Sequence, residues 1–403
     1  MGSGRRFFLS TSLLMVAVAG TTSAQQTRSF AMGFTPWPSD ATTAAVDLAY
    51  AQISAHGDLI AHHFDGGVPW PEALAGAPLP AAVEAELAAR VAATPPGHRV
   101  YLALSPLNGS RDGLAPYWNT TPNDPLPPAW AAKPFDDPDV IDAYANFSLA
   151  LIDRFDPVSF NYGIEASELL IHSPGRWAGF VTFAQGVYDR IKAVHPQLPV
   201  FISVSLKDPT SSDAAAIRAG LPAILPSTDL LGISVYPYAF FGHANAGDPA
   251  NLPGDWLDQA VGLAANRPLV ITETGWIAED LVIPTFGLNV PATPIHQADY
   301  LAALFSEANR LGVGFIVWFT PMDYDALWNG ALGQDPLAAI WRDTGLYDET
   351  GTARPALGLW DEWLAKPLPP GVPVARNHEW ILVGVLLTTP WLIGLQRIRR
   401  EVA

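Results

Sequence analysis

Eight apolar segments separated by stretches with helical periodicity are the feature that most limits how this chain of 403 residues can fold. Intervening segments such as 175–195 and 295–311 place apolar residues three and four positions apart, as the buried face of a helix requires. Strands that are apolar almost throughout are typical of a parallel sheet covered on both faces. Eight such units predict one α/β domain, a closed (β/α)8 TIM barrel at residues 29–365. The apolar segments are 29–35, 58–65, 99–107, 159–166, 199–206, 230–238, 269–276 and 314–320.

Composition excludes several classes of protein. The chain has no cysteine, so disulfides, thiolate catalysis and cysteine-bound zinc are ruled out. A net charge of −17 argues against nucleic acid as a partner, because phosphate binding requires a basic surface. No glycine-rich phosphate loop follows any of the eight segments, which argues against a dinucleotide fold. We therefore expect neither a cofactor nor a metal ion.

The two ends of the chain have the composition of targeting segments. Residues 1–24 combine Arg5 and Arg6 with an apolar run and small residues, which predicts a signal peptide that resembles a twin-arginine signal. A Pro-rich linker is expected at 366–379, a transmembrane or sorting segment at 380–396, and a basic tail at 397–403. A buried core helix is the alternative for the apolar segment. We expect an exported protein, periplasmic or at the cell surface, tethered to the membrane by its C-terminus.

The carboxyl ends of the predicted strands carry polar and aromatic residues, and these ends form the active face of such barrels. Glu165 lies at the end of the fourth predicted strand and Glu273 at the end of the seventh. Only one side chain of the adjacent pair His62 and His63 can face the barrel axis. Asp65 follows them. These positions predict a site at the mouth of the barrel.

Four short motifs resemble one clan of enzymes. They are "YGIEASELL" (162–170), "GISVYPY" (232–238), "ITETGW" (271–276) and "FIVWFTP" (315–321). Together they resemble the retaining (β/α)8 glycoside hydrolases, and they are closest in style to the endo-β-1,4-galactanase-like branch. The likeness spans about residues 30–365.

The resemblance implies roles for individual residues. Glu273 would be the nucleophile and Glu165 the acid/base. Tyr236 would hydrogen-bond the nucleophile, and Trp318 would form the floor of the subsite that holds the reacting sugar. The physical requirements agree, because a retaining glycosidase needs two carboxyls about 5 Å apart in environments that separate their pKa values.

Further residues are expected to bind substrate. Aromatic faces match the apolar faces of sugar rings, and fourteen tryptophans are available. We expect Trp37, Trp70 and Trp276 to contact the glycan, together with His63 and Asp65. Taken singly, Trp37 and Trp70 fit packing better than sugar binding, whereas Trp276 fits sugar binding better. Metal ligation is the lesser alternative for the histidines.

One residue departs from the pattern of the clan. The clan usually has an asparagine immediately before the acid/base residue, where it holds the sugar 2-hydroxyl, and this chain has Ile164. Asn161 points the same way along the strand but lies deeper. Either another donor serves, or turnover is impaired, or the protein binds glycans without cutting them.

The sequence thus predicts an exported glycoside hydrolase that cleaves β-glycosidic bonds of a polysaccharide or oligosaccharide by retaining double displacement. Two alternatives stay open. One is a catalytically weak barrel that binds glycans, and the other is a transglycosylase that remodels exported polysaccharide.

Overall fold

The computed structural model describes residue 1 and residues 27–368. The predicted signal peptide beyond Met1, most of the Pro-rich linker, the apolar segment 380–396 and the basic tail lie outside the described residues. In the described part of the chain, no helix is both long enough and apolar enough to cross a membrane.

Eight parallel strands close into a barrel, which confirms the predicted fold class. The strands follow one another around the ring in chain order, and β1 pairs with β10 to close it. Each lies inside the apolar segment predicted for it and is up to four residues shorter. The strands are β1 (Ala31–Phe34), β2 (Leu59–Phe64), β3 (Arg99–Leu104), β4 (Ser159–Gly163), β5 (Val200–Ser205), β6 (Leu231–Val235), β7 (Leu269–Thr274) and β10 (Phe315–Trp318).

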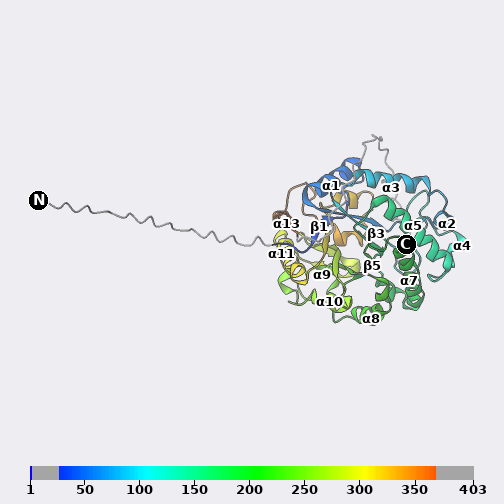
Figure 1. Cartoon of the computed structure of the whole chain (residues 1–403). Coiled ribbons are helices and arrows are strands. Elements are labelled where there is room, and N and C mark those ends of the chain that lie inside the picture. The colour runs from blue at the N-terminus through cyan, green and yellow to red at the C-terminus, as the bar shows by residue number, and fades with distance from the viewer. Residues whose placement is uncertain (2–26, 369–403) are drawn as a thin grey trace.

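Helices surround the barrel (Figure 1). The predicted helices at 175–195 and 295–311 are α7 and α11. The helices are α1 (Thr43–His56), α2 (Trp70–Ala75), α3 (Ala81–Ala93), α4 (Pro128–Ala131), α5 (Pro138–Phe155), α6 (Glu168–His172), α7 (Trp177–Val194), α8 (Ser212–Gly220), α9 (Pro237–Phe240), α10 (Asp258–Ala264), α11 (Pro294–Leu311), α12 (Asp325–Asn329) and α13 (Pro355–Leu364). A small hairpin, β8 (Leu281–Ile283) with β9 (Leu288–Val290), lies between β7 and α11.

The apolar side chains of the barrel strands divide between two clusters because successive residues of a strand point to opposite faces. In β10, Phe315 and Val317 belong to the cluster inside the barrel. Ile316 and Trp318 belong to the larger cluster between the barrel and the helices. This alternation decides which side of the barrel each strand residue can reach.

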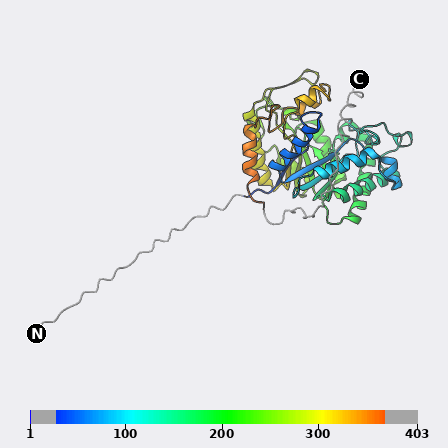
Figure 2. The same cartoon turned by 90° about the horizontal axis from the view of Figure 1, so that it is seen from above.

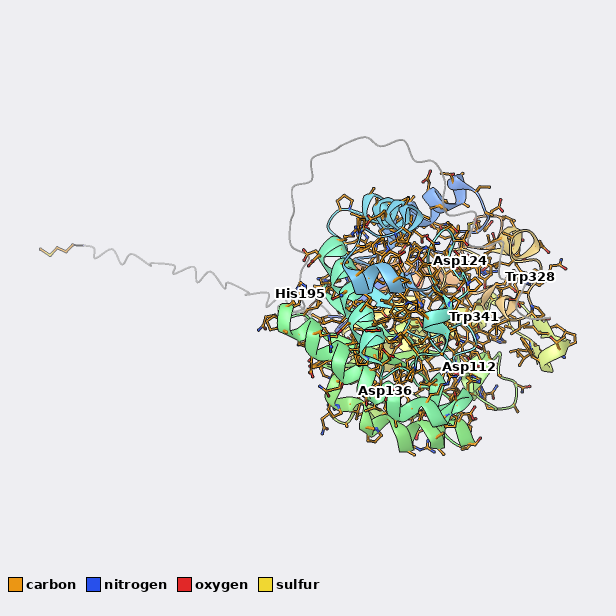
Figure 3. The ribbon with its side chains drawn as sticks, turned by 90° about the vertical axis from the view of Figure 1, so that its right-hand side faces the viewer. Asp112, Asp124, Asp136, His195, Trp328 and Trp341 are labelled. Carbon is orange, nitrogen blue, oxygen red and sulfur yellow. The ribbon has the colours of Figure 1, made fainter. Side chains whose placement is uncertain are left out.

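The long connections lie at the carboxyl ends of the strands. Figure 3 shows Asp112 and Trp341, from the connections after β3 and β10, toward one end of the molecule. His195, which follows α7, lies toward the other end. The first of these ends is the face where the predicted site residues are placed.

The opposite face joins the two ends of the described chain. Arg28, whose side chain is 5% exposed, donates to the carbonyl oxygens of Leu364 and Lys366 at the end of α13 (orange in Figure 2). Its guanidinium also lies 2.7 Å from Asp58, which accepts a hydrogen bond from the backbone of Met32. One arginine therefore ties the last helix to the first two strands.

We expect Arg28→Ala to lower the free energy of unfolding by about 3 kcal/mol, because it leaves buried carbonyl groups and Asp58 without their donor. Chemical denaturation monitored by circular dichroism would measure this loss. Arg190→Ala is the matched control, since Arg190 and its partner Asp142 are both more than 40% exposed. It should change stability by about 0.5 kcal/mol or less, and equal losses in the two variants would contradict this account of Arg28.

Candidate active site

The two strands that carry the predicted carboxylates are irregular near their carboxyl ends. In β7 an extra residue lies between Ile271 and Glu273 relative to β6, and between Ile271 and Thr274 relative to β10. In β4 an extra residue lies between Asn161 and Gly163 relative to β5. Among the described barrel strands, the register shifts only at ladders that include β4 or β7. A bulge re-aims the side chains that follow it, so both acidic positions are set by local departures from the regular strand.

Glu165 is held by its backbone. It has a φ of 47°, in the left-handed region that residues other than glycine seldom occupy. Its N–H donates to Ser203 Oγ at 2.9 Å. Asn161, inside the barrel, donates to the same hydroxyl and to Tyr101 Oη, both at 3.0 Å. The deeper asparagine therefore supports the backbone of Glu165 from below and is itself fully buried.

Glu273 and Glu165 each have a polar partner at the barrel mouth. Tyr236, which follows β6, donates a 2.6 Å hydrogen bond to Glu273 Oε1. His63 Nδ1 lies 3.7 Å from Glu273 Oε2. On the other side, Arg111 Nη2 donates to Glu165 Oε2 at 3.3 Å. The hydrogen bond expected between Tyr236 and Glu273 is thus present.

The charges of the two carboxylates influence each other. Burial, followed by the charge of Glu165, raises the pKa of Glu273 to about 8, although the Tyr236 hydrogen bond and Arg111 oppose the rise. Burial also lowers the pKa of His63, so its ring is neutral at pH 7. The Tyr236 pKa lies well above its ordinary value because of burial and the nearby Glu273 carboxylate. Tyr236 therefore remains a hydrogen-bond donor to Glu273.

Packing around Gly275 explains why the "ETGW" motif has a glycine at this position. A Cβ atom there would lie 2.7 Å from the carbonyl oxygen of Phe319 and 3.2 Å from the ring of Tyr236. Both distances are too short for a side chain to fit without displacement. The glycine therefore allows the end of β7 to pass close to the residues beside Glu273.

Three of the predicted sugar platforms are wholly buried, which corrects that expectation. Trp70 stacks on Trp130, and Trp276 stacks on Tyr300 with ring centres 4.4 Å apart. Trp318 donates its indole N–H to a backbone oxygen. All three side chains belong to the core between the barrel and the helices, so they offer no surface to a glycan.

Other aromatic residues lie beside the carboxylates. Trp37 packs against Phe319 with ring centres 5.4 Å apart, and Trp341 packs edge-on against Tyr236 at 5.8 Å. Trp37, Phe319 and Trp341 are partly exposed, and we call them the aromatic wall. Of these, only Trp37 was expected. The alternation of β10 would have pointed to Phe319, because that residue has the same parity as inward-facing Val317 and the opposite parity to Trp318.

The two adjacent histidines separate as expected. His63 faces the site, whereas His62 is fully buried, bonds Thr94 Oγ1 at 2.8 Å and packs on Phe155. Asp65 is exposed at the rim, and its charge acts on both His63 and Glu273. These two predicted substrate residues are thus brought to the mouth.

Ile164 offers almost no surface to a ligand. Its side chain is 3% exposed and packs with the apolar residues inside the barrel. Because this side chain can donate no hydrogen bond, a sugar hydroxyl at this position would need a donor from another residue. Arg111 and His63 are the nitrogen donors that lie next to the two carboxylates.

A group of acidic residues below the rim could be mistaken for a metal site. Asp323, Asp325 and Asp343 bring carboxylate oxygens within 4.8 Å of one another. Two arginines already satisfy them: Arg354 contacts Asp323 at 2.7 and 2.9 Å, and Arg342 contacts Asp343 at 2.7 Å. The geometry is that of an ion-pair network.

A cavity of about 400 Å³ lies beside the site. It is lined by residues 238–246, which follow β6, and by residues 287–291 of the hairpin connection. Neither carboxylate lines it. It is therefore a neighbour of the site, separate from the place where the two acids meet.

No protein-family model and no curated protein matches the sequence. Solved structures do resemble the fold. An exo-β-1,4-mannosidase from Opitutaceae bacterium strain TAV5 superposes with a TM-score of 0.56 at 15% identity, covering 87% of this chain and 62% of the mannosidase. The GH5_18 protein of Streptomyces cattleya, in complex with Manβ1-4GlcNAc, gives 0.56 at 16% identity over 86% of this chain and 83% of that one. The GH53 catalytic domain of Ignisphaera aggregans gives 0.50 at 16% identity over 88% and 99%.

These neighbours agree with the clan that the sequence motifs resemble, since glycoside hydrolases of the GH5 and GH53 types are among them. The chain spans less than two thirds of the length of the mannosidase. At such low identities the likeness establishes the (β/α)8 fold, and the activity has to be argued from the site.

Replacing Tyr236 tests the electrostatics of this site. We expect Tyr236→Phe to raise the pKa of Glu273 by about one to two units, because the lost hydrogen bond stabilises the ionised carboxylate. The measurement is a pH titration of glutamate carboxyl carbons by NMR, with Glu273→Gln to assign the signal. Tyr238→Phe is the control, since its hydroxyl donates to the backbone of Ile340 instead. An unchanged or lower pKa in Tyr236→Phe would show that the tyrosine does not stabilise the charge.

Proposed function

We propose that the protein is a glycoside hydrolase that cleaves β-glycosidic bonds of a polysaccharide or oligosaccharide with retention of configuration. The observation that carries the proposal is the pairing of Glu165 and Glu273 at the barrel mouth, with Tyr236 donating to Glu273. Two carboxyls whose charges interact, one fixed by a tyrosine, are what double displacement requires. The clan resemblance of the sequence and the glycosidase neighbours support the same activity.

The reaction would proceed in two displacements. Glu273, ionised, attacks the anomeric carbon while Glu165 donates its proton to the departing glycosidic oxygen. Glu165 then removes a proton from water, and that water attacks the same carbon and releases Glu273. Tyr236 fixes the orientation of the Glu273 carboxylate through both steps.

The substrate surface follows from the partly exposed side chains. The aromatic wall offers flat apolar faces to sugar rings, and His63 and Asp65 offer polar groups to their hydroxyls. With Ile164 buried, hydrogen bonding to the reacting sugar would come from His63, on the opposite side of the mouth. This arrangement supports a glycan-binding mouth without metal or cofactor chemistry being invoked.

We further propose that the chain is exported and held at a membrane by its C-terminal segment. The support comes from the sequence: residues 1–24 have the pattern of a signal peptide, and 380–396 are apolar and followed by arginines. The proposed arrangement places the barrel on the outer side of the cytoplasmic membrane.

The anchor is tested by fractionation. We expect the full chain to sediment with membranes and a chain that ends at Lys366 to stay in the supernatant. A chain that keeps the tail but carries Leu382→Asp and Leu387→Asp should also be released, because charges in the bilayer core are costly. Equal distribution of all three proteins would rule out the anchor.

Hydrolysis is tested on a panel of β-linked glycans, scored by new reducing ends. We expect Glu273→Gln and Glu165→Gln each to lower kcat by about 10³-fold or more, because each acts in the bond-breaking step. Glu307→Gln is the matched control and should retain full activity, because Glu307 is a partly exposed residue of α11 that pairs with Arg310.

A 2-fluoro glycosyl fluoride of the cleaved sugar should label the peptide that contains Glu273. Product of inverted configuration, or a label on another residue, would show that the roles are misassigned. Binding of glycans without release of any reducing ends would favour the glycan-binding alternative, and longer products in place of shorter ones would favour a transglycosylase.

A further inference from the structure

Arg111 contacts the proposed acid/base residue, and the sequence motifs gave no indication of this contact. It lies in the long connection after β3, with a φ of 57°, and its side chain is 19% exposed. One guanidinium N–H donates to Ser105 Oγ at 3.1 Å and another to Glu165 Oε2 at 3.3 Å. The Arg111 guanidinium is thus held next to the carboxyl group that would protonate the glycosidic oxygen.

This contact opposes the role of Glu165 in the resting protein. An acid catalyst must carry a proton, and a neighbouring guanidinium favours the ionised carboxylate. Glu273, the proposed nucleophile, must be ionised, yet burial and the Glu165 charge raise its pKa to about 8. In the resting protein the proposed acid thus lies against a cation, and a new partner for Arg111 would remove that cation from Glu165.

We propose that Arg111 binds an anionic group of the substrate, a carboxylate on a sugar next to the cleaved bond, and that this binding draws the guanidinium away from Glu165. The inference rests on the hydrolase function proposed above and adds the chemical class of its substrate: acidic, uronate-type glycans.

The geometry of the contact suits an exchangeable partner. Arg354, a structural arginine, holds Asp323 through two nitrogens at 2.7 and 2.9 Å. Arg111 instead reaches Glu165 through one nitrogen at a longer distance. A substrate carboxylate could accept two parallel N–H bonds from the same guanidinium, which is a stronger arrangement than the one it replaces.

One further cation lies beside the loop of Arg111. Arg176 lies 3.2 Å from where a Cβ of Gly113 would be. It also acts on Asp112 of the same loop, although hydrogen bonds from Asn108 and Ser110 lower the pKa of Asp112 more than this charge does.

Arg111 contacts Glu165, and its charge also acts on His63 and Glu273. His63 is neutral at pH 7 because burial lowers its pKa. Asp65 is exposed after β2, and its charge would repel an anion approaching from that side. An acidic sugar is therefore directed toward Arg111 and away from Asp65.

The exchange involves ion pairs only. The substrate carboxylate takes the guanidinium and Glu165 loses its counter-ion, so no covalent bond forms or breaks in this step. Hydrolysis then requires Glu273 as the carboxylate that attacks the anomeric carbon and Glu165 as the acid for the leaving oxygen.

The test uses pairs of β-linked oligosaccharides, from cello- and manno-backbones, that share a backbone and differ in a C6 carboxylate or hydroxymethyl group. Calorimetry gives Kd for each member without requiring turnover, and reducing-end release gives kcat/KM. We expect the full-length protein to bind the acidic member of at least one pair about 10- to 100-fold more tightly. The preference in kcat/KM should be at least as large.

Arg111→Gln should abolish the preference, and Arg111→Lys should retain part of it, because lysine keeps the charge but loses the planar fork. Arg190→Gln, an exposed position on α7, should leave the preference unchanged. Thermal unfolding shows whether each variant is folded. If Arg111→Gln does not fold, Arg111→Lys decides the test.

No preference in the unaltered protein for the acidic member of any pair, or a preference that survives Arg111→Gln, would overturn the inference. If Arg111→Gln hydrolyses neutral glycans with full activity, the anion site is ruled out and the hydrolase function stands. An Arg111-dependent preference in binding, with no cleavage of any glycan, would support the anion site and contradict the hydrolase.

Discussion

Closure of eight parallel strands into a ring is the constraint on which the rest of the molecule depends. Every strand must point its carboxyl end to the same mouth, so residues more than a hundred positions apart in the chain meet there. A regular strand alternates its side chains and would place Glu273 on the face opposite to Thr272. The bulges in β7 and β4 interrupt that alternation where the acids are needed. The site thus depends on bulges in two strands of an otherwise regular barrel.

The parts of this structure that sequence could predict are those that depend on periodicity. Eight apolar segments and their helices gave the barrel and its strand order, because burial on both faces leaves little choice of fold. Glu165, Glu273 and Tyr236 were found because they lie at the carboxyl ends of strands, which barrel closure brings together. The expectation for Trp318 failed because its place in the alternation of β10 points the side chain toward the helices.

Contacts made by loops could not be predicted. Arg111 sits in a long connection whose path depends on packing against the rest of the rim, and no periodic pattern marks it. Trp341 reaches Tyr236 from the connection after β10, more than a hundred residues further along the chain. Burial also distinguishes tryptophans that a sequence makes look alike: Trp37 is partly exposed, whereas Trp70 and Trp276 have no accessible surface. Tertiary packing, rather than residue type, decides which aromatic faces are available to a ligand.

The hydrogen bonds of Arg28 have a consequence for how the barrel would be presented. Because that residue joins the start of β1 to the end of α13, the chain enters and leaves the barrel at the face opposite the mouth. An attachment through the segment after Lys366 would therefore hold the barrel by the face opposite the mouth. The mouth with the two carboxylates would then point away from the surface of attachment, toward polymers in the surrounding medium. Arg28, on the face opposite the two carboxylates, would in this way determine the orientation of the barrel mouth.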